Sequence, residues 1–246
     1  MNLTDIRQGK YGDCFILSSI SSILSSLGEE FIDKIIKVLD DNTIEFTYYI
    51  ENNSIFVKHK LIYTYSEHLY KISKKNKTWV KYIEFAYITL FYGGLVDKLQ
   101  EEGGIAFDVL QKLTGYKSKI IINRLFDNKH EIFYEICKQR LIKNIWKNDF
   151  IKHLDKLSNK YLSIIQIKIW NILICNVNTD INSNNLCKLN IPCVIGIQGH
   201  FDDSEIQGII IGHLYSVIGI SMDKYNNKFI HVFNPHHNVL SRKTHY

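Results

Sequence analysis

Hydrophobic residues in the first part of the chain recur at helical spacing in three segments. In residues 14–27 the apolar positions repeat every three or four residues, as in a helix packed against a core. Residues 79–91 and 106–113 show the same spacing, and glycine follows each of them, at Gly93-Gly94 and at Gly115. We therefore predict three helices in this part of the chain.

Other segments carry the β-branched and aromatic residues that favour strands. Residues 44–50 and 55–63 flank Asn52-Asn53, a pattern that predicts a hairpin. In the last sixty residues, polar turns separate three further predicted strands, at residues 192–198, 209–220 and 228–233.

Between these regions we expect a short strand at residues 119–123 and a helix from residue 130 to about residue 157. The pattern as a whole predicts an α+β fold. Its first part, residues 1–116, is rich in helices, and its second part, residues 117–246, is rich in strands.

The composition is that of a folded globular chain. It has 246 residues, of which 46% are hydrophobic and two are proline, so it can bury a sizeable core. The net charge of +5 is spread along the chain and falls short of a dense basic face, so no nucleic-acid partner is expected. The five cysteines contain no CxxC pair, which argues against a disulfide framework and a zinc ribbon.

Targeting signals are not apparent. Charged residues interrupt the N-terminus, and the apolar run at residues 161–177 carries Gln166, Lys168 and Asn171. We expect no membrane span. The expected location is the cytoplasm, or a host cell that the protein enters as an effector without a cleavable signal peptide.

Cys14 stands where a glycine-punctuated loop meets the predicted helix at residues 14–27. A helix N-terminus favours a thiolate and can lower a cysteine pKa to roughly 3.5–7.5, from about 8.5. Gln8, six residues upstream, can place its side-chain amide beside the Cys14 N–H, giving two donors for an oxyanion. Taken singly, such residues are more often structural, so this interpretation depends on their partners.

Two residues near the C-terminus can complete a catalytic set. His213 lies early in a predicted strand, next to Gly212, and is a candidate base. Asn234 ends the next strand, just before Pro235. If the two strands pair as neighbours, the Asn234 amide can fix the orientation of the imidazole. His231, His236 and His237 make a poor metal site, and no metal is expected.

Three motifs, in this order, resemble those of the calpain-type papain-like cysteine proteases. They are the segment Gln-Gly-Lys-Tyr-Gly-Asp-Cys-Phe-Ile-Leu at residues 8–17, Gly-His-Leu-Tyr-Ser-Val at residues 212–217, and Asn234-Pro235. Trp79 and Glu84 also resemble positions of a family helix, Trp-x-x-x-x-Glu-x-Ala-Tyr. The resemblance covers most of the chain. It implies a papain-like fold, with the first lobe at residues 1–116, the second at 117–246 and a cleft between them.

The resemblance also implies a cysteine endopeptidase acting on a protein or peptide substrate. Cys14 would be the nucleophile, His213 the general base and then acid, and Asn234 the residue that orients His213. Gln8 and the Cys14 N–H would form the oxyanion hole. Two alternatives remain open: an inactive binding module with a protease fold, and an effector that removes ubiquitin-like tags or transfers acyl groups.

The sequence departs from the family at positions that bind calcium. Asp5 matches an acidic ligand position, but Lys77 stands two residues before Trp79, where the family carries another, and Leu240 replaces a third. We therefore predict no cofactor and no calcium requirement. The family's tryptophan after Asn-Pro is also missing, and His236 takes its place. The short C-terminus suggests a minimal catalytic core, either complete or a domain of a longer protein.

Overall fold

The computed structural model describes residues 1–9, 12–50, 55–63, 77–95, 99, 104–118, 167, 169–177, 185–197, 205–206, 209–210, 213–236 and 244–245. The chain divides into two compact units. One contains Met1–Lys119 and Asn176–Tyr246, and the other contains Ile120–Cys175. In the second unit, residues 169–174 are helical. The strand predicted at 119–123 and the helix predicted at 130–157 lie outside the described residues, and the two lobes stay a prediction.

Helix α1 (Cys14–Leu27) lies in the core of the first unit and has the predicted bounds. Every residue from position 15 to position 24 is buried, including four serines. Serine hydroxyls donate to carbonyls one turn earlier, from Ser19 to Phe15 and from Ser21 to Leu17, each at 2.7 Å. Because these polar groups are satisfied and the side chains are small, the helix can be buried on several sides.

Three further helices contribute to this core: α2 (Glu29–Ile35), α4 (Thr78–Tyr92) and α6 (Ala106–Thr114). The predictions of α4 and α6 are confirmed, whereas α2 was not predicted. Helices α4 and α6 end at Gly93, with φ 65°, and at Gly115, with φ 69°. These left-handed conformations are strained for residues with a Cβ atom, which explains the glycine at both ends. No helix among the described residues has the length and apolar character needed to cross a bilayer.

An antiparallel sheet packs against this core with the strand order β1-β2-β3. Its strands are β1 (Ile36–Val38), β2 (Thr43–Ile50) and β3 (Ile55–Ile62). Ile50 pairs with Ile55, which confirms the predicted hairpin. The Asn52-Asn53 turn itself lies outside the described residues.

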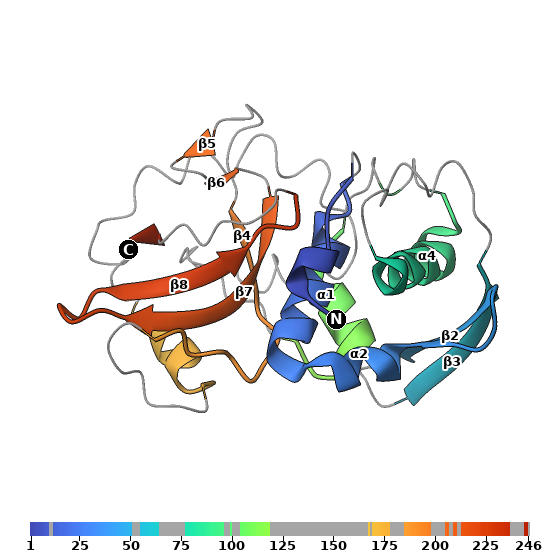
Figure 1. Ribbon diagram of the computed structural model, residues 1–246, viewed down its shortest axis with the longest axis horizontal. Coiled ribbons are helices and arrows are strands. Elements are labelled where there is room, and N and C mark those ends of the chain that lie inside the picture. Colours follow the sequence, from blue (N-terminus) through green and yellow to red (C-terminus); the bar gives the residue numbers. More distant parts are fainter. Residues whose placement is uncertain are drawn as a thin grey trace, which may run out of the picture. The chain divides into compact units, whose positions relative to one another are not determined.

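A second antiparallel sheet carries the C-terminal motifs, with the order β4-β7-β8-β9. Its strands are β4 (Val194–Ile197), β7 (His213–Met222), β8 (Lys228–Phe233) and β9 (Thr244–His245). Strand β7 lies beside α1 (Figure 1), and the Ser216 hydroxyl donates to the Ser18 carbonyl at 2.7 Å. The sheet and helix α1 are therefore held together directly.

The structure divides the strand predicted at residues 209–220 into two. Ile209–Ile210 forms β6, which pairs with β5 (Glu205–Ile206) in a separate ladder. Strand β7 begins at His213 and pairs with β4 and β8. The single prediction failed because β6 and β7, both apolar, pair with different partners. It follows that His213 is the first residue of its strand.

Candidate active site

Cys14 is the first residue of α1 and is half-buried. The preceding residue, Asp13, occupies the N-cap position, and its carbonyl accepts hydrogen bonds from the N–H groups of Ile16 and Leu17. The helix therefore begins where the sequence predicted, with the thiol in its first turn. The Leu214 N–H donates a hydrogen bond to this thiol. That contact joins Cys14 to β7 at the residue that follows His213.

The acidity of the Cys14 thiol differs from the prediction. Burial raises its pKa to about 11, the hydrogen bond from the Leu214 N–H lowers it, and the charge of Asp13 raises it. The sequence predicted a lowered pKa from the helix N-terminus alone. The prediction was wrong because loss of hydration and a neighbouring carboxylate outweigh the N–H groups of the first turn.

His213 and Asn234 meet at one end of the second sheet. Strand β7 begins at His213, β8 ends just before Asn234, and the two strands pair as neighbours, which is the condition under which the contact was expected. The Nε2 atom of His213 lies 2.8 Å from the Oδ1 atom of Asn234. The His213 side chain is buried, so this hydrogen bond is formed where little water competes with it.

A second hydrogen bond identifies the atoms in this contact. The His236 N–H lies 2.9 Å from the same Asn234 oxygen, and a backbone N–H can only donate. The Asn234 atom must therefore be the acceptor oxygen, and Nε2 of His213 must donate to it. In the neutral imidazole the lone pair then belongs to Nδ1, which makes Nδ1 the basic nitrogen.

Gln8 is anchored through its backbone. Its N–H donates to the Pro235 carbonyl at 2.6 Å, next to Asn234. Its side chain lies close enough to the Asp13 carboxyl group, one residue before Cys14, to lower the pKa of that group. The structure therefore brings Gln8 to the start of α1 and to the segment that follows β8.

Two buried acidic residues lie close to each other, one of them directly before Cys14, and no chemical role was predicted for either. Asp13 is 0% exposed and Glu84, on α4, is 1% exposed. The pKa of Asp13 is well above its ordinary value because of burial and of the neighbouring Glu84 carboxyl group. A glutamate inside the mostly apolar segment at residues 80–92 was the signal that could have identified this pair, since such a residue needs a polar partner when it is buried.

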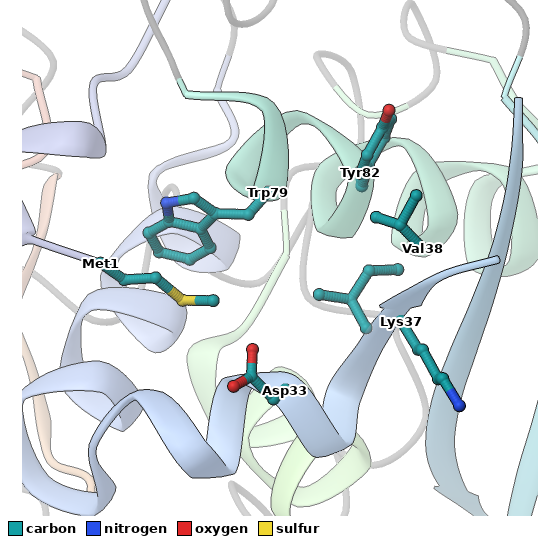
Figure 2. A pocket seen from close by; sticks show the side chains of 7 residues that line it. Met1, Asp33, Lys37, Val38, Trp79 and Tyr82 are labelled. Carbon is teal, nitrogen blue, oxygen red and sulfur yellow. The ribbon is translucent and has the colours of Figure 1, made fainter. Parts of the chain in front are cut away.

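A separate pocket of about 350 Å³ lies in the first unit, next to the start of α4 (Figure 2). It contains none of the candidate catalytic residues. The side chains that line it include the aromatic rings of Trp79 and Tyr82 and the charged groups of Asp33 and Lys37. The remaining lining residues are Met1, Ile36 and Val38.

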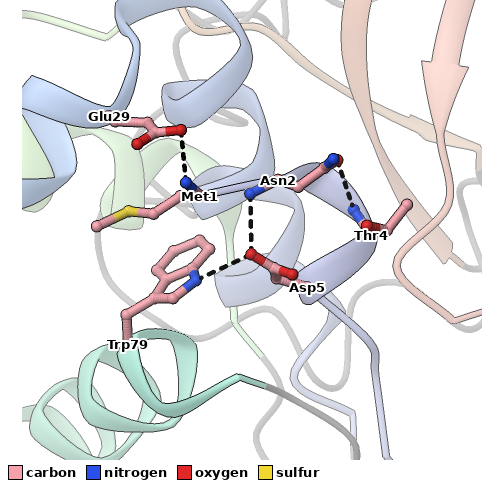
Figure 3. A network of polar contacts seen from close by, with 6 residues as sticks. All are labelled: Met1, Asn2, Thr4, Asp5, Glu29 and Trp79. Carbon is pink, nitrogen blue, oxygen red and sulfur yellow. Dashed lines mark hydrogen bonds and ion pairs between the residues drawn. The ribbon is translucent and has the colours of Figure 1, made fainter.

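A network of polar contacts fixes the N-terminus beside this pocket (Figure 3). Asp5 ends the short helix η1 (Leu3–Asp5), and its Oδ2 atom accepts hydrogen bonds from the Asn2 N–H at 2.9 Å and from Trp79 Nε1 at 3.4 Å. The Lys77 N–H donates to the Asp5 carbonyl at 3.2 Å. Asp5 and Lys77 are therefore neighbours, and one carboxylate oxygen of Asp5 is already engaged with N–H donors.

These neighbours test whether the calcium ligands implied by the resemblance are present. A calcium site needs six to eight oxygen ligands, several of them carboxylates. Here a lysine lies beside Asp5 in place of a second acid, and two donors bind one Asp5 oxygen. The residues do not fit such a site. Within the described ranges, no three or more His, Cys, Asp or Glu side chains form a group that could hold a metal. Leu240 and Gly212 lie outside those ranges.

Comparison with known proteins identifies the family. The sequence model of the calpain family of cysteine proteases matches residues 1–241, nearly the whole chain. None of the curated proteins matches it. The family match and the motifs of the nucleophile loop agree. The chain belongs to the calpain family of cysteine proteases.

Proposed function

We propose that the protein is a calcium-independent endopeptidase that uses Cys14 as nucleophile, His213 as general base and acid, and Asn234 as the residue that orients His213. The observation that carries this proposal is the hydrogen bond of 2.8 Å between His213 and Asn234. Together with the His236 N–H, it leaves Nδ1 as the basic nitrogen. The hydrogen bond from the Leu214 N–H to the Cys14 thiol supports a position of the nucleophile next to this base.

The reaction begins with proton transfer from the Cys14 thiol to Nδ1 of His213. The sulfur attacks the carbonyl carbon of the scissile peptide bond, whose oxygen becomes an oxyanion. His213 then gives its proton to the leaving amine as the C–N bond breaks, and a thioester remains on Cys14. A water molecule, deprotonated by His213, hydrolyses the thioester and restores the thiol.

The raised pKa of the thiol makes His213 essential to this mechanism. With a pKa of about 11, only about one Cys14 thiol in ten thousand is ionised at pH 7 unless a base takes its proton. A thiol of this kind is a poor nucleophile by itself. The proposal therefore assigns the activation of Cys14 to His213 and not to the helix N-terminus.

Gln8 and the Cys14 N–H are the proposed oxyanion hole. The backbone hydrogen bond of Gln8 to Pro235 supports this role, because it holds the Gln8 loop beside the segment that carries Asn234, and a preorganised donor costs no reorganisation during the reaction. A side-chain amide carries two hydrogens and can donate to an oxyanion.

Calcium independence rests on the surroundings of Asp5. The Asn2 N–H and the Trp79 indole donate to one oxygen of the Asp5 carboxylate, and the backbone neighbour of Asp5 at the second ligand position is Lys77, whose side chain offers no oxygen. A dication there would lack the several carboxylate ligands that calcium needs.

Cleavage of an unstructured protein substrate, followed by mass spectrometry, tests the proposed function. We expect peptide cleavage by the wild type with either calcium or chelator present. Cleavage should be lost in Cys14→Ser and retained in Cys175→Ser, because Cys175 is an exposed cysteine that is not one of the proposed site residues. Absence of cleavage in a folded wild type, or acyl transfer to an added amine instead of hydrolysis, would contradict the proposal.

A further inference from the structure

The His213 ring has a second imidazole as its neighbour. His236 follows Asn234 by two residues, and its ring centroid lies 5.8 Å from that of His213, with the two planes at 88°. His236 is exposed to solvent, whereas His213 is buried. A solvent-exposed histidine can take up a proton from water in mildly acidic solution.

The backbone of His236 contacts Asn234, and its side chain contacts His213. Its N–H donates to the Asn234 oxygen that also accepts from His213, so the backbone helps to fix the tautomer of the base. Its ring lies edge-on to the His213 ring. A change of charge on the His236 ring therefore occurs close to the base.

We propose that His236 is a positioning residue whose proton uptake protects the Cys14–His213 couple from protonation and so extends its reactivity to lower pH. This inference rests on the proposed function. The couple loses reactivity in acid when His213 takes a proton from solution, because the protonated ring can no longer accept the thiol proton. A positive charge already present on His236 opposes the arrival of that second positive charge.

The size of the effect follows from the separation of the rings. Two unit charges about 6 Å apart, one of them exposed, change each other's protonation midpoint by about half a pH unit to one pH unit. The effect is electrostatic, so it becomes smaller at high ionic strength. A purely structural contribution of the ring would not show this salt dependence.

Other ionisable groups near the two rings do not account for a difference between variants at position 236. The ring centroid of Tyr215, on β7, lies 5.0 Å from that of His213. The Cys14 thiol, on α1, contacts the N–H of Leu214, the residue after His213. Asp13 precedes Cys14. On the N-terminal segment that binds Pro235, Arg7 precedes Gln8. All these groups are the same in the wild type and in the variants, so a shift between them reports the charge at position 236.

The test is the pH dependence of Cys14 alkylation by iodoacetamide, resolved by residue with mass spectrometry from about pH 4 to about pH 8. The variants are His236→Phe, which keeps an uncharged ring, and His236→Lys, which keeps a permanent positive charge. His59→Phe is the matched control, because His59 is an exposed histidine on β3. Circular dichroism at each pH restricts the comparison to folded protein.

We expect the acidic midpoint of Cys14 reactivity to rise by about half a pH unit to one pH unit in His236→Phe. In His236→Lys the midpoint should stay at or below that of the wild type, and His59→Phe should match the wild type. The rise in His236→Phe should shrink when salt is added.

Two results would overturn the inference in distinguishable ways. Fast labelling of Cys14 with the same acidic midpoint in the wild type and in His236→Phe would overturn the role of His236 and leave the proposed function intact. Slow labelling of Cys14 in the folded wild type at every pH would overturn the proposed function, and this inference with it.

Discussion

The N–H of Gln8 donates a hydrogen bond of 2.6 Å to the carbonyl oxygen of Pro235, at the opposite end of the sequence. Pro235 follows Asn234, whose side chain accepts the hydrogen bond from His213. The loop that carries the candidate oxyanion donor is thus tied by backbone to the segment that orients the candidate base. A small displacement of either segment changes the geometry of both, and catalytic rates are sensitive to such displacements.

Removing the Asn234 side chain should lower activity by affecting the base. In Asn234→Ala, the Nε2–H of His213 and the N–H of His236 lose their shared acceptor. We expect kcat/KM to fall by about a hundredfold to a thousandfold, with most of the loss in kcat. Steady-state kinetics on a peptide substrate measures this, with Asn185→Ala, an exposed position, as control. An unchanged kcat in Asn234→Ala would exclude the orienting role.

The raised pKa of Asp13 should make the free energy of unfolding decrease as the pH rises. Because its pKa is raised in the folded state above the ordinary value of 3.8, the folded protein holds a proton that the unfolded chain releases. This contribution is fully present below about pH 4 and is lost as the pH rises through the raised pKa. Urea unfolding at a series of pH values should show a smaller decrease in Asp13→Asn than in the wild type.

Asp40 provides the control, because its pKa is shifted in the opposite direction to that of Asp13. The pKa of Asp40, which is exposed, is lowered by hydrogen bonds from Asn42 and Thr43. Its contribution is present above the ordinary pKa and is lost as the pH falls through the lowered one. Asp40→Asn should therefore leave the decrease above about pH 4 unchanged. If the unfolding free energy of Asp13→Asn and of Asp40→Asn changed with pH in the same way, Asp13 would not be the cause of the decrease.

Asp13 should also control the acidity of the nucleophile. Its charge contributes to the raised pKa of the Cys14 thiol, after burial. In a His213→Ala background, Asp13→Asn should therefore lower that pKa, because the nearby negative charge is gone while burial is unchanged. Ultraviolet absorbance of the thiolate, taken as the difference from Cys14→Ser, measures the titration. A thiol pKa that stayed at about 11 would show that burial acts alone.

Asp5 should stabilise the protein through hydrogen bonds and not through calcium. Asp5→Ala removes the acceptor for the Asn2 N–H and for the Trp79 indole, and should cost about 1 kcal/mol of unfolding free energy. Thermal unfolding should show the same loss with calcium as with chelator. A ligand that binds only the folded state raises its stability. A higher melting temperature of the wild type in calcium would therefore contradict this prediction.

The sequence predicted most of the elements that position the site, for reasons that lie in local pattern. The helical spacing of apolar residues identified α1 with its first residue, Cys14, and the glycines at positions 93 and 115 identified two helix ends. Helix α2 and strand β1 were missed. They are short, with seven residues in α2 and three in β1, and α2 ends directly before β1 begins at Ile36, so each shows too few repeats of its own pattern to be recognised.

What the sequence could not predict depends on burial, which is set by distant contacts. Asp13 reads as a loop residue, and its raised pKa arises only because it is buried and lies close to Glu84 on α4. The pKa of Cys14 was predicted in the wrong direction because the pattern shows the helix N-terminus but not the loss of water around the thiol. Similarly, residues 209–210 were assigned to β7 because an apolar run does not reveal its pairing partner.

The activation of Cys14 by His213 is the central claim, and site-resolved alkylation tests it most directly. The experiment is a brief, low-dose iodoacetamide treatment near pH 6.5 of the wild type and His213→Ala, with calcium or with chelator. With a thiol pKa of about 11, fast labelling at this pH requires a base that accepts the proton. We predict fast labelling of Cys14 alone, lost in His213→Ala and indifferent to calcium. Equally slow labelling of all five cysteines in the folded wild type, or labelling of Cys14 only when calcium is present, would contradict the account.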